Sequence, residues 1–138
     1  MAFICAASAV AGCGGGSGED AYCGALKKDQ GVFADDSSGM ALIGNLPALH
    51  RLAAKAPDDL DDEWQTVLSA LDSLDEAIEK AGVKPGDFAN GQPPAGLSAT
   101  EKTRIAQAAS EVADQDVVDA FSGIDQQARD VCKLQLGL

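Results

Sequence analysis

Cys13 lies in sequence surroundings typical of a lipid attachment site. Val10-Ala11-Gly12 precedes it, and Gly14-Gly15-Gly16-Ser17-Gly18 follows it directly. Small residues before a cysteine allow a membrane peptidase to close around the backbone once the thiol carries a diacylglycerol, and cleavage then leaves that cysteine first. The pattern is a lipobox. It predicts a signal peptide over residues 1–12, a lipid on Cys13 and a location on the extracytoplasmic face of the cell membrane.

The segment before Cys13 contains two of the three parts of a secretory signal, which are a basic start, an apolar stretch and small residues at the cleavage point. The apolar stretch runs from Ala2 to Ala11, but no Lys or Arg precedes Phe3. We therefore expect the true start to lie upstream of Met1. The alternative is an ordinary apolar terminus that forms a short buried helix. The stretch is shorter than the roughly 20 apolar residues that span a bilayer.

The chain contains four cysteines, which allow three disulfide pairings. Loss of the signal removes Cys5, and lipidation uses Cys13, so Cys23 and Cys132 remain. Exported proteins fold in an oxidising compartment in which thiols pair. We predict a disulfide between Cys23 and Cys132, which contributes roughly 4 to 5 kcal/mol on the chain-entropy model. Two independent buried thiols are the alternative.

The charge balance of the chain is acidic. It has 22 Asp and Glu against 10 Lys and Arg, a formal net charge of -12. Phosphate backbones are bound by clustered Lys and Arg, and here only Lys27-Lys28 forms an adjacent basic pair. We expect no nucleic-acid partner, and we expect membrane contact through the lipid on Cys13 and not through a polybasic surface.

His50 is the only histidine, so a histidine-based metal cluster is excluded and a single candidate general base remains. A catalytic role would need a nucleophile and an orienting carboxylate, and no local motif supplies them. We interpret His50 as structural and predict that the protein is not an enzyme.

Residues 58–63 form the densest acidic cluster and could offer carboxylate oxygens to calcium. The cluster lacks the glycine and the spaced glutamate of an EF-hand loop. Anionic residues also stabilise the start of a helix through its dipole. We interpret this cluster, and likewise Asp114, Asp116 and Asp119, as helix starts, and we expect no metal and no cofactor.

Trp64 and Phe88 could line a ligand pocket, because such pockets often have aromatic walls. Trp64 lies on the most regular amphipathic stretch of the chain, so core packing explains it with fewer assumptions. We expect Phe88 to lie against the core from within a long loop over residues 82–97.

Apolar residues recur at helical spacing in five stretches, and no segment alternates as a strand would. We expect Pro47 to kink or split the second helix, Asp58 to cap the third and Gly82 to follow its end. Ser98-Ala99-Thr100-Glu101 is a capping box that starts the fourth helix. The expected helices cover residues 20–34, 40–55 and 60–81, a stretch after Ser98 that includes Ile105, Ala109 and Val112, and a stretch from Val117 through Phe121, Ile124, Ala128 and Val131 to Cys132.

The fold class that follows is all-α. We predict a flexible tether over residues 13–19, followed by a compact bundle of four to five helices over residues 20–138. The disulfide would join the first helix to the last, and Leu134 and Leu136 would complete the packing.

Several local features span this expected domain. They are the lipobox, Tyr22-Cys23 with Leu26, Ala56-Pro57 leading to Glu63-Trp64, and Val131-Cys132 with Leu134. In these features the chain resembles small actinobacterial cell-envelope lipoproteins of unassigned function. The resemblance implies a helical domain tethered outside the cytoplasmic membrane, with a disulfide between Cys23 and Cys132. It implies no substrate.

Our first functional hypothesis is a non-catalytic envelope lipoprotein that binds another envelope protein or a cell-wall component. The alternative is a capture or sensing module for a small molecule or an ion, in which the loop over residues 82–97 closes over a cleft beside Trp64. An enzyme built around His50 and a spacer without any specific site are further alternatives.

Overall fold

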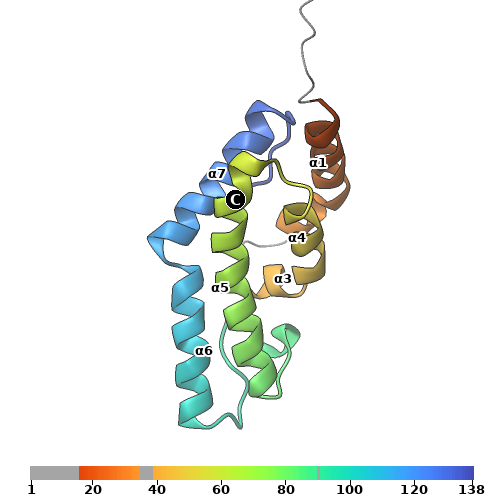
Figure 1. Cartoon of the computed structure of the whole chain (residues 1–138). Helices are drawn as coiled ribbons and strands as arrows, with labels where there is room; N and C mark the ends of the chain where they lie inside the picture. The colour runs from red at the N-terminus through yellow and green to blue at the C-terminus, as the bar shows by residue number, and fades with distance from the viewer. Residues whose placement is uncertain (1–15, 35–38, 90) are drawn as a thin grey trace, which may run out of the picture.

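The longest helix, α5 (Asp61–Lys80), forms the axis around which the other helices are arranged (Figure 1). The structure is a computed structural model that describes residues 16–34, 39–89 and 91–138. Within these residues it contains seven α-helices and no strand, so the predicted all-α class is confirmed. The remaining elements are α1 (Gly16–Asp29), α2 (Gly31–Ala34), α3 (Gly39–Ile43), α4 (Leu46–Ala53), the 3₁₀ turns η1 (Asp58–Leu60) and η2 (Pro85–Asp87), α6 (Ala99–Val112) and α7 (Gln115–Asp130).

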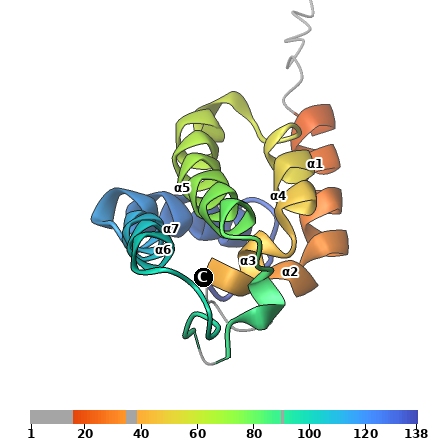
Figure 2. The same ribbon diagram turned by 90° about the horizontal axis from the view of Figure 1, so that it is seen from below.

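Helix α5 separates two groups of helices. It contacts α6 and α7 on one side and α3 and α4 on the other, and α1 packs on α4. Figures 1 and 2 show this arrangement from two directions. The apolar residues of α5 meet both groups, which explains why the stripe predicted from the sequence is so continuous.

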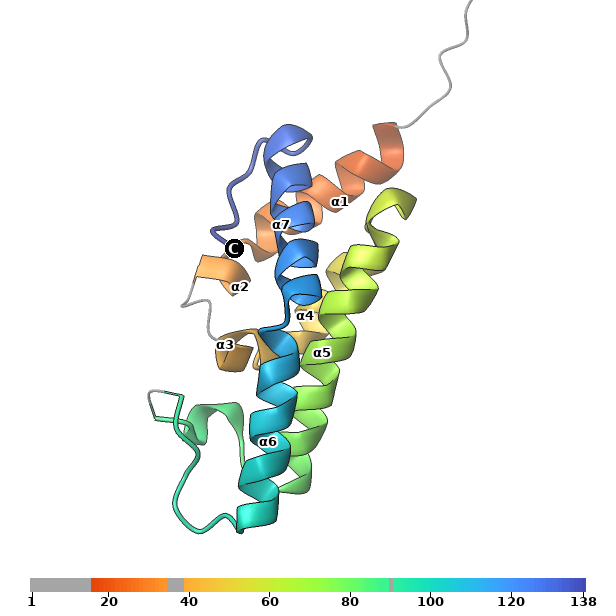
Figure 3. The same cartoon turned by 90° about the vertical axis from the view of Figure 1, so that its left-hand side faces the viewer.

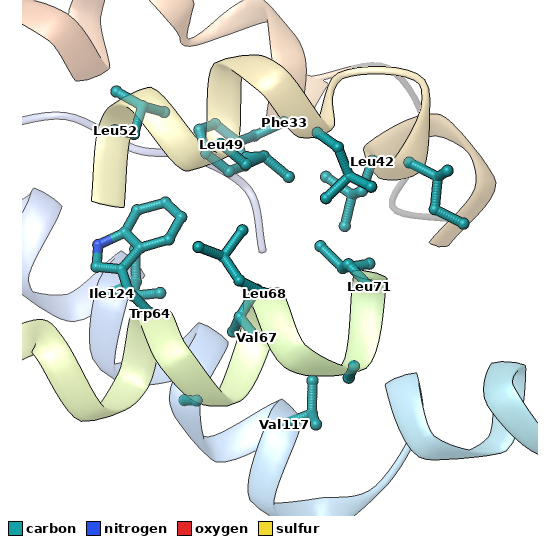
Figure 4. Packing of buried hydrophobic residues seen from close by; sticks show 14 of the residues in the cluster. Phe33, Leu42, Leu49, Leu52, Trp64, Val67, Leu68, Leu71, Val117 and Ile124 are labelled. Atoms are coloured by element: carbon teal, nitrogen blue, oxygen red, sulfur yellow. The ribbon is translucent and has the colours of Figure 1, made fainter. Parts of the chain in front are cut away.

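The core between these helices is apolar, and Figure 4 shows its packing around α5. Trp64 is 2 % exposed, and its indole N–H donates a hydrogen bond of 3.0 Å to the hydroxyl of Tyr22. The pair joins α1 to α5. The largest fully buried side chains are Tyr22, Leu26, Leu49, Leu52, Val67, Leu71, Leu74, Ile78 and Ile124.

The N-terminal part of the domain differs from the prediction. Helix α1 begins at Gly16, so the residues of the expected tether that the structure describes are helical. Glu19 in its first turn stabilises the helix start through the dipole. The expected helix over residues 20–34 is interrupted before Gly31, because glycine has a low helix propensity. Residues 1–12, Cys13 and the rest of the segment to residue 15 lie outside the described part of the chain.

The second predicted helix is split, as expected, but the break precedes Pro47. Helix α3 ends at Ile43 and α4 begins at Leu46, with Pro47 in its first turn. A proline is tolerated there because the amide hydrogens of the first turn have no partner within the helix. Asn45 stabilises the break by donating from its side-chain amide to the carbonyl of Ala41 over 3.0 Å.

The predicted ends of α5 and the start of α6 are confirmed with one exception. Asp58 does not cap α5, because residues 58–60 form η1 and Leu60 takes the cap position. Gly82 follows the end of α5 at a φ of +69°, where a side chain would be strained. At α6, Ser98 and Glu101 form both hydrogen bonds of the capping box.

The C-terminal segment closes the fold beside α1 and α7. The disulfide between Cys23 and Cys132 is present, with a Cα–Cα distance of 5.1 Å, and it joins α1 to the end of α7 as predicted. Leu136 is buried and Leu134 packs against the core. Val131, expected on the apolar face, is instead 44 % exposed, because α7 ends at Asp130 and the chain turns away.

None of the helices that the structure describes is both long and apolar enough to cross a membrane.

Candidate functional site

An apolar cleft of about 520 Å³ opens where α6 meets α7, opposite α3. Its walls come from α3, α5, α6, α7, the loop over residues 82–97 and the C-terminal segment. Figure 3 shows α3 beside the junction of α6 and α7, with the loop below it. The lining residues are Gly39, Met40, Leu42, Leu74, Gly91, Ala109, Val112, Ala113, Val118, Phe121, Ser122 and Leu138.

The break between α6 and α7 creates this hollow. Helix α6 ends at Val112, and Asp114 adopts an extended conformation before α7 begins at Gln115. The two helices therefore pack on α5 at different angles (Figure 1). Ala109 and Ala113 line the cleft with methyl groups only, so space remains where a larger side chain would fill it.

The opposite wall approaches closely through a glycine. A Cβ atom at Gly39 would lie 3.5 Å from a methyl group of Val112 and 3.7 Å from one of Leu74. Those are ordinary contact distances, so α3 stands directly against α5 and α6 at this end of the cleft. At the other end Val118 is 45 % exposed and forms part of the rim.

The chemistry of the lining is almost entirely hydrocarbon. Among the described residues that line the cleft, no side chain carries a charge and Ser122 has the only polar side chain. Its hydroxyl donates a hydrogen bond of 3.0 Å to the carbonyl of Val118, one turn earlier in α7. The cleft can therefore exclude water from an apolar ligand, but its side chains include no acid, base or cation.

Trp64 and Phe88, which the sequence offered as candidate pocket residues, do not line this cleft. Trp64 is buried in the core between α4 and α5 (Figure 4), so the core interpretation is confirmed and a cleft beside Trp64 is wrong. Phe88 is half-buried and packs against the core, as predicted. From the described part of the loop over residues 82–97, Gly91 lines the cleft.

His50 lies on α4 at the surface. Its Nε2 atom lies 2.9 Å from Oδ1 of Asp72 on α5, and both side chains are half exposed. This partner could not be predicted from local sequence, because 22 positions separate the two residues. Neither residue lines the cleft.

The acidic residues at positions 58–63 belong to η1 and the first turn of α5. In the described chain, no group of three or more His, Cys, Asp and Glu side chains could hold a metal ion. Asp114 and Asp116 lie at the start of α7, and Asp119 accepts a hydrogen bond of 2.8 Å from Gln115. These residues are helix starts and surface contacts.

The shifted pKa values also have structural causes. Burial raises the pKa of Tyr22 to about 12, against the opposing effect of its hydrogen bond from Trp64. Burial, with Glu79 and Asp72 as weaker contributors, raises the pKa of Asp75. Hydrogen bonds from Ser98 lower the pKa of Glu101. Shifted groups often mark catalytic sites, but none of these three lines the cleft.

The cleft residues were missed from the sequence because they come from six parts of the chain: α3, α5, the loop over residues 82–97, α6, α7 and the C-terminal segment. One signal was available in the sequence. Val118 lies off the apolar stripe of α7, so the amphipathic pattern of the helix does not explain an apolar side chain at that position.

Fold and cleft together define a disulfide-linked all-α domain with an apolar cleft. No family model, curated protein or solved structure matches this chain. Membership of an actinobacterial lipoprotein family therefore stays a prediction.

Proposed function

We propose that this protein is a non-catalytic binding protein, anchored by a lipid on Cys13 to the extracytoplasmic face of a cell membrane, which captures an apolar small molecule. The observation that carries the binding function is the cleft between α3 and the junction of α6 with α7. Its volume of about 520 Å³ lies within the range of about 300 to 1,000 Å³ that is usual for small-molecule sites. Apolar pockets of this kind drive binding by removing hydrocarbon surface from water.

The disulfide supports an extracytoplasmic location. Structural disulfides persist in oxidising compartments and are rare in the cytosol of mesophiles. The bond between Cys23 and Cys132 joins α1 to the end of α7, so oxidation stabilises the folded domain. The lipobox supports attachment through Cys13.

An envelope protein or cell-wall component as the partner, our first hypothesis from the sequence, has weaker support. The exposed large apolar side chains among the described residues are Val118 and Val131. Val118 belongs to the cleft, and a single exposed apolar residue is normal on a protein surface. The capture of a small molecule, our alternative from the sequence, is the better supported function, with the cleft in a different place.

The anchor is tested by the intact mass of the protein from the membrane fraction of its own host, beside a Cys13→Ala variant expressed with its upstream sequence. We expect cleavage before Cys13, an added diacylglycerol group and two hydrogens fewer than the reduced chain. Of these mass changes, the variant should show only the loss of two hydrogens that the disulfide causes. A full-length, unmodified and reduced protein in the cytosol would overturn the proposed location.

The binding function is tested with an apolar fluorescent dye whose emission rises in hydrocarbon surroundings. The protein is the oxidised full chain with Cys5→Ala and Cys13→Ala, which cannot be acylated at position 13. We expect saturable binding of one dye molecule, because the cleft is a single hollow.

Two exposed valines, one on α7 and one directly after its end, provide a matched pair of variants for the dye. Val118 lines the cleft at 45 % exposure, and Val131 lies outside it at 44 %. We expect Val118→Asp to weaken dye binding about tenfold or more, because the bound dye would remove the new carboxylate from water without pairing it, and Val131→Asp to leave it unchanged. Equal effects of the two substitutions would contradict a specific site.

A further inference from the structure

We propose that the ligand of the cleft is a single-chain aliphatic molecule with an uncharged, hydroxyl-bearing head group, as in a fatty alcohol or a monoacylglycerol. This inference rests on the proposed binding function and specifies its ligand class. The chain would lie in the cleft between α3, α5 and α6, and the head group would lie at the rim beside Ser122.

The lining favours an aliphatic chain over an aromatic ring system. Phe121 is the single aromatic side chain among the described residues that line the cleft, and apart from Ser122 and the glycines the others are aliphatic or Met40. Flat ring systems bind best where several aromatic faces surround them. Met40, Leu42 and Leu74 instead present methyl and methylene groups that match an extended hydrocarbon chain, and methionine adapts readily to irregular shapes.

The size of the cleft favours one chain. About 520 Å³ is a volume suited to a drug-sized ligand, for which pockets measure about 300 to 1,000 Å³. A membrane lipid with two or more long chains would leave part of its hydrocarbon outside the cleft and exposed to water.

The charges around the cleft disfavour an anionic head group. Within the lining that the structure describes there is no Lys, Arg or His to pair with a carboxylate or a phosphate. Asp114 and Asp116 lie at the start of α7, close in sequence to Val118 at the rim. The whole chain carries a formal net charge of -12. An anionic head group would therefore be repelled by the protein, and it would find no cationic side chain in the described lining.

Ser122 defines the polar end of the ligand. A serine hydroxyl has one hydrogen to donate and two lone pairs that accept. The hydrogen is already donated to the carbonyl of Val118 at 3.0 Å, so the oxygen is left to accept. A ligand hydroxyl can donate to it, whereas a carboxylate or an ester has no hydrogen to offer.

The experiment compares three ligands with the same chain: monodecanoylglycerol, methyl decanoate and decanoate. Each is titrated calorimetrically, below its aggregation concentration, into the oxidised full chain with Cys5→Ala and Cys13→Ala. We expect one site for monodecanoylglycerol and a rise in Tm, because a ligand that binds only the folded state stabilises it. Decanoate should bind about tenfold or more weakly, because its charge finds no partner.

Three variants test where the ligand lies. Val118→Asp should weaken monodecanoylglycerol binding about tenfold or more, while its matched control Val131→Asp should leave binding unchanged. Ser122→Ala should weaken monodecanoylglycerol by a factor of about three to ten, the usual worth of one net hydrogen bond, and leave methyl decanoate unchanged. Far-ultraviolet circular dichroism and Trp64 fluorescence confirm that each variant is folded.

The outcomes separate this inference from the proposed function. If the apolar dye binds the cleft and Val118→Asp abolishes that binding, but monodecanoylglycerol does not displace the dye, the binding function stands and this ligand class is wrong. If decanoate binds as tightly as monodecanoylglycerol, or if Ser122→Ala weakens both esters equally, the assigned head group is overturned. If neither dye nor lipid binds saturably, both proposals fail.

Discussion

At the scale of single residues, the pair of Tyr22 and Trp64 carries the most information. The chain contains one tyrosine and one tryptophan, and they meet in the core through a hydrogen bond of 3.0 Å. The position of Trp64 in the core could be predicted, because it lies on the apolar stripe of a regular helix. Its partner could not, because that contact depends on how α1 packs against α5.

Titration of Tyr22 tests this contact. Its pKa is raised from 10.0 to about 12 in the folded protein. A raised pKa stabilises the fold fully below pH 10, and that stability is lost as pH rises from 10 through about 12. We expect phenolate absorbance to appear near pH 12 in the folded protein and near pH 10 in denaturant. Tyr22→Phe, which removes the only phenol, is the blank, and a midpoint near 10 without denaturant would contradict the buried contact.

At the scale of elements, local signals were predictable and those that depend on tertiary packing were not. The capping box of Ser98 and Glu101 was found because all its atoms lie within four residues. Asp58 was wrongly expected to cap α5, because η1 places Leu60 and not Asp58 at the helix start. The cleft was missed because it, too, depends on tertiary packing. Its shape depends on the turn between α6 and α7 and on the approach of α3, and neither is visible in a helical pattern.

The capping box gives a prediction for α6. Ser98 accepts from the backbone N–H of Glu101, and loss of such a cap costs about 1 kcal/mol. Ser98→Ala should lower the free energy of unfolding by that amount in urea denaturation followed by Trp64 fluorescence. Ser110→Ala, an exposed serine within the same helix, should have no cost. Equal effects of the two substitutions would contradict a role for the cap.

Glu101 adds a pH dependence to the same cap. Its hydrogen bonds from Ser98 lower its pKa below the usual 4.5. A lowered pKa gives stability above that value, and the stability is lost as pH falls through the folded pKa. The difference in unfolding free energy between wild type and Glu101→Gln should therefore shrink when the pH is lowered from 7 to below about 4. A difference that stays constant over this range would contradict the assignment.

Asp125 is a buried residue of α7 that holds the C-terminal segment against this helix. It is 5 % exposed, accepts from the backbone N–H of Leu136 over 3.2 Å and pairs with Arg129 one turn later. Its removal would leave the buried N–H of Leu136 without an acceptor, which costs about 1 to 3 kcal/mol. We expect this loss for Asp125→Ala in urea denaturation. Asp130→Ala, on the exposed side of the same helix, is the control. A loss of the same size there would contradict this role of Asp125.

At the scale of the whole molecule, the disulfide connects the stability of the fold to the shape of the cleft. Cys132 begins the C-terminal segment, which is also held by Asp125 and by a hydrogen bond of 2.7 Å from the side chain of Gln30 to the carbonyl of Gln135. Leu138, farther along this segment, lines the cleft. The pairing itself was predictable from the cysteines, but its link to the cleft required the path of the chain after α7.

Reduction of the disulfide should therefore lower both stability and ligand affinity. The bond encloses a loop with a sequence separation of 109, and the chain-entropy model assigns it roughly 4 to 5 kcal/mol. We expect Cys23→Ser with Cys132→Ser to lower the unfolding free energy by about this amount, a large part of the 5 to 15 kcal/mol typical of a domain. At temperatures where this variant is still folded, the dye should bind more weakly, because Leu138 is less firmly held. A stability loss with unchanged dye affinity would show that Asp125 and Gln30 hold the segment without the bond, and would remove the oxidation state of Cys23 and Cys132 from the binding mechanism.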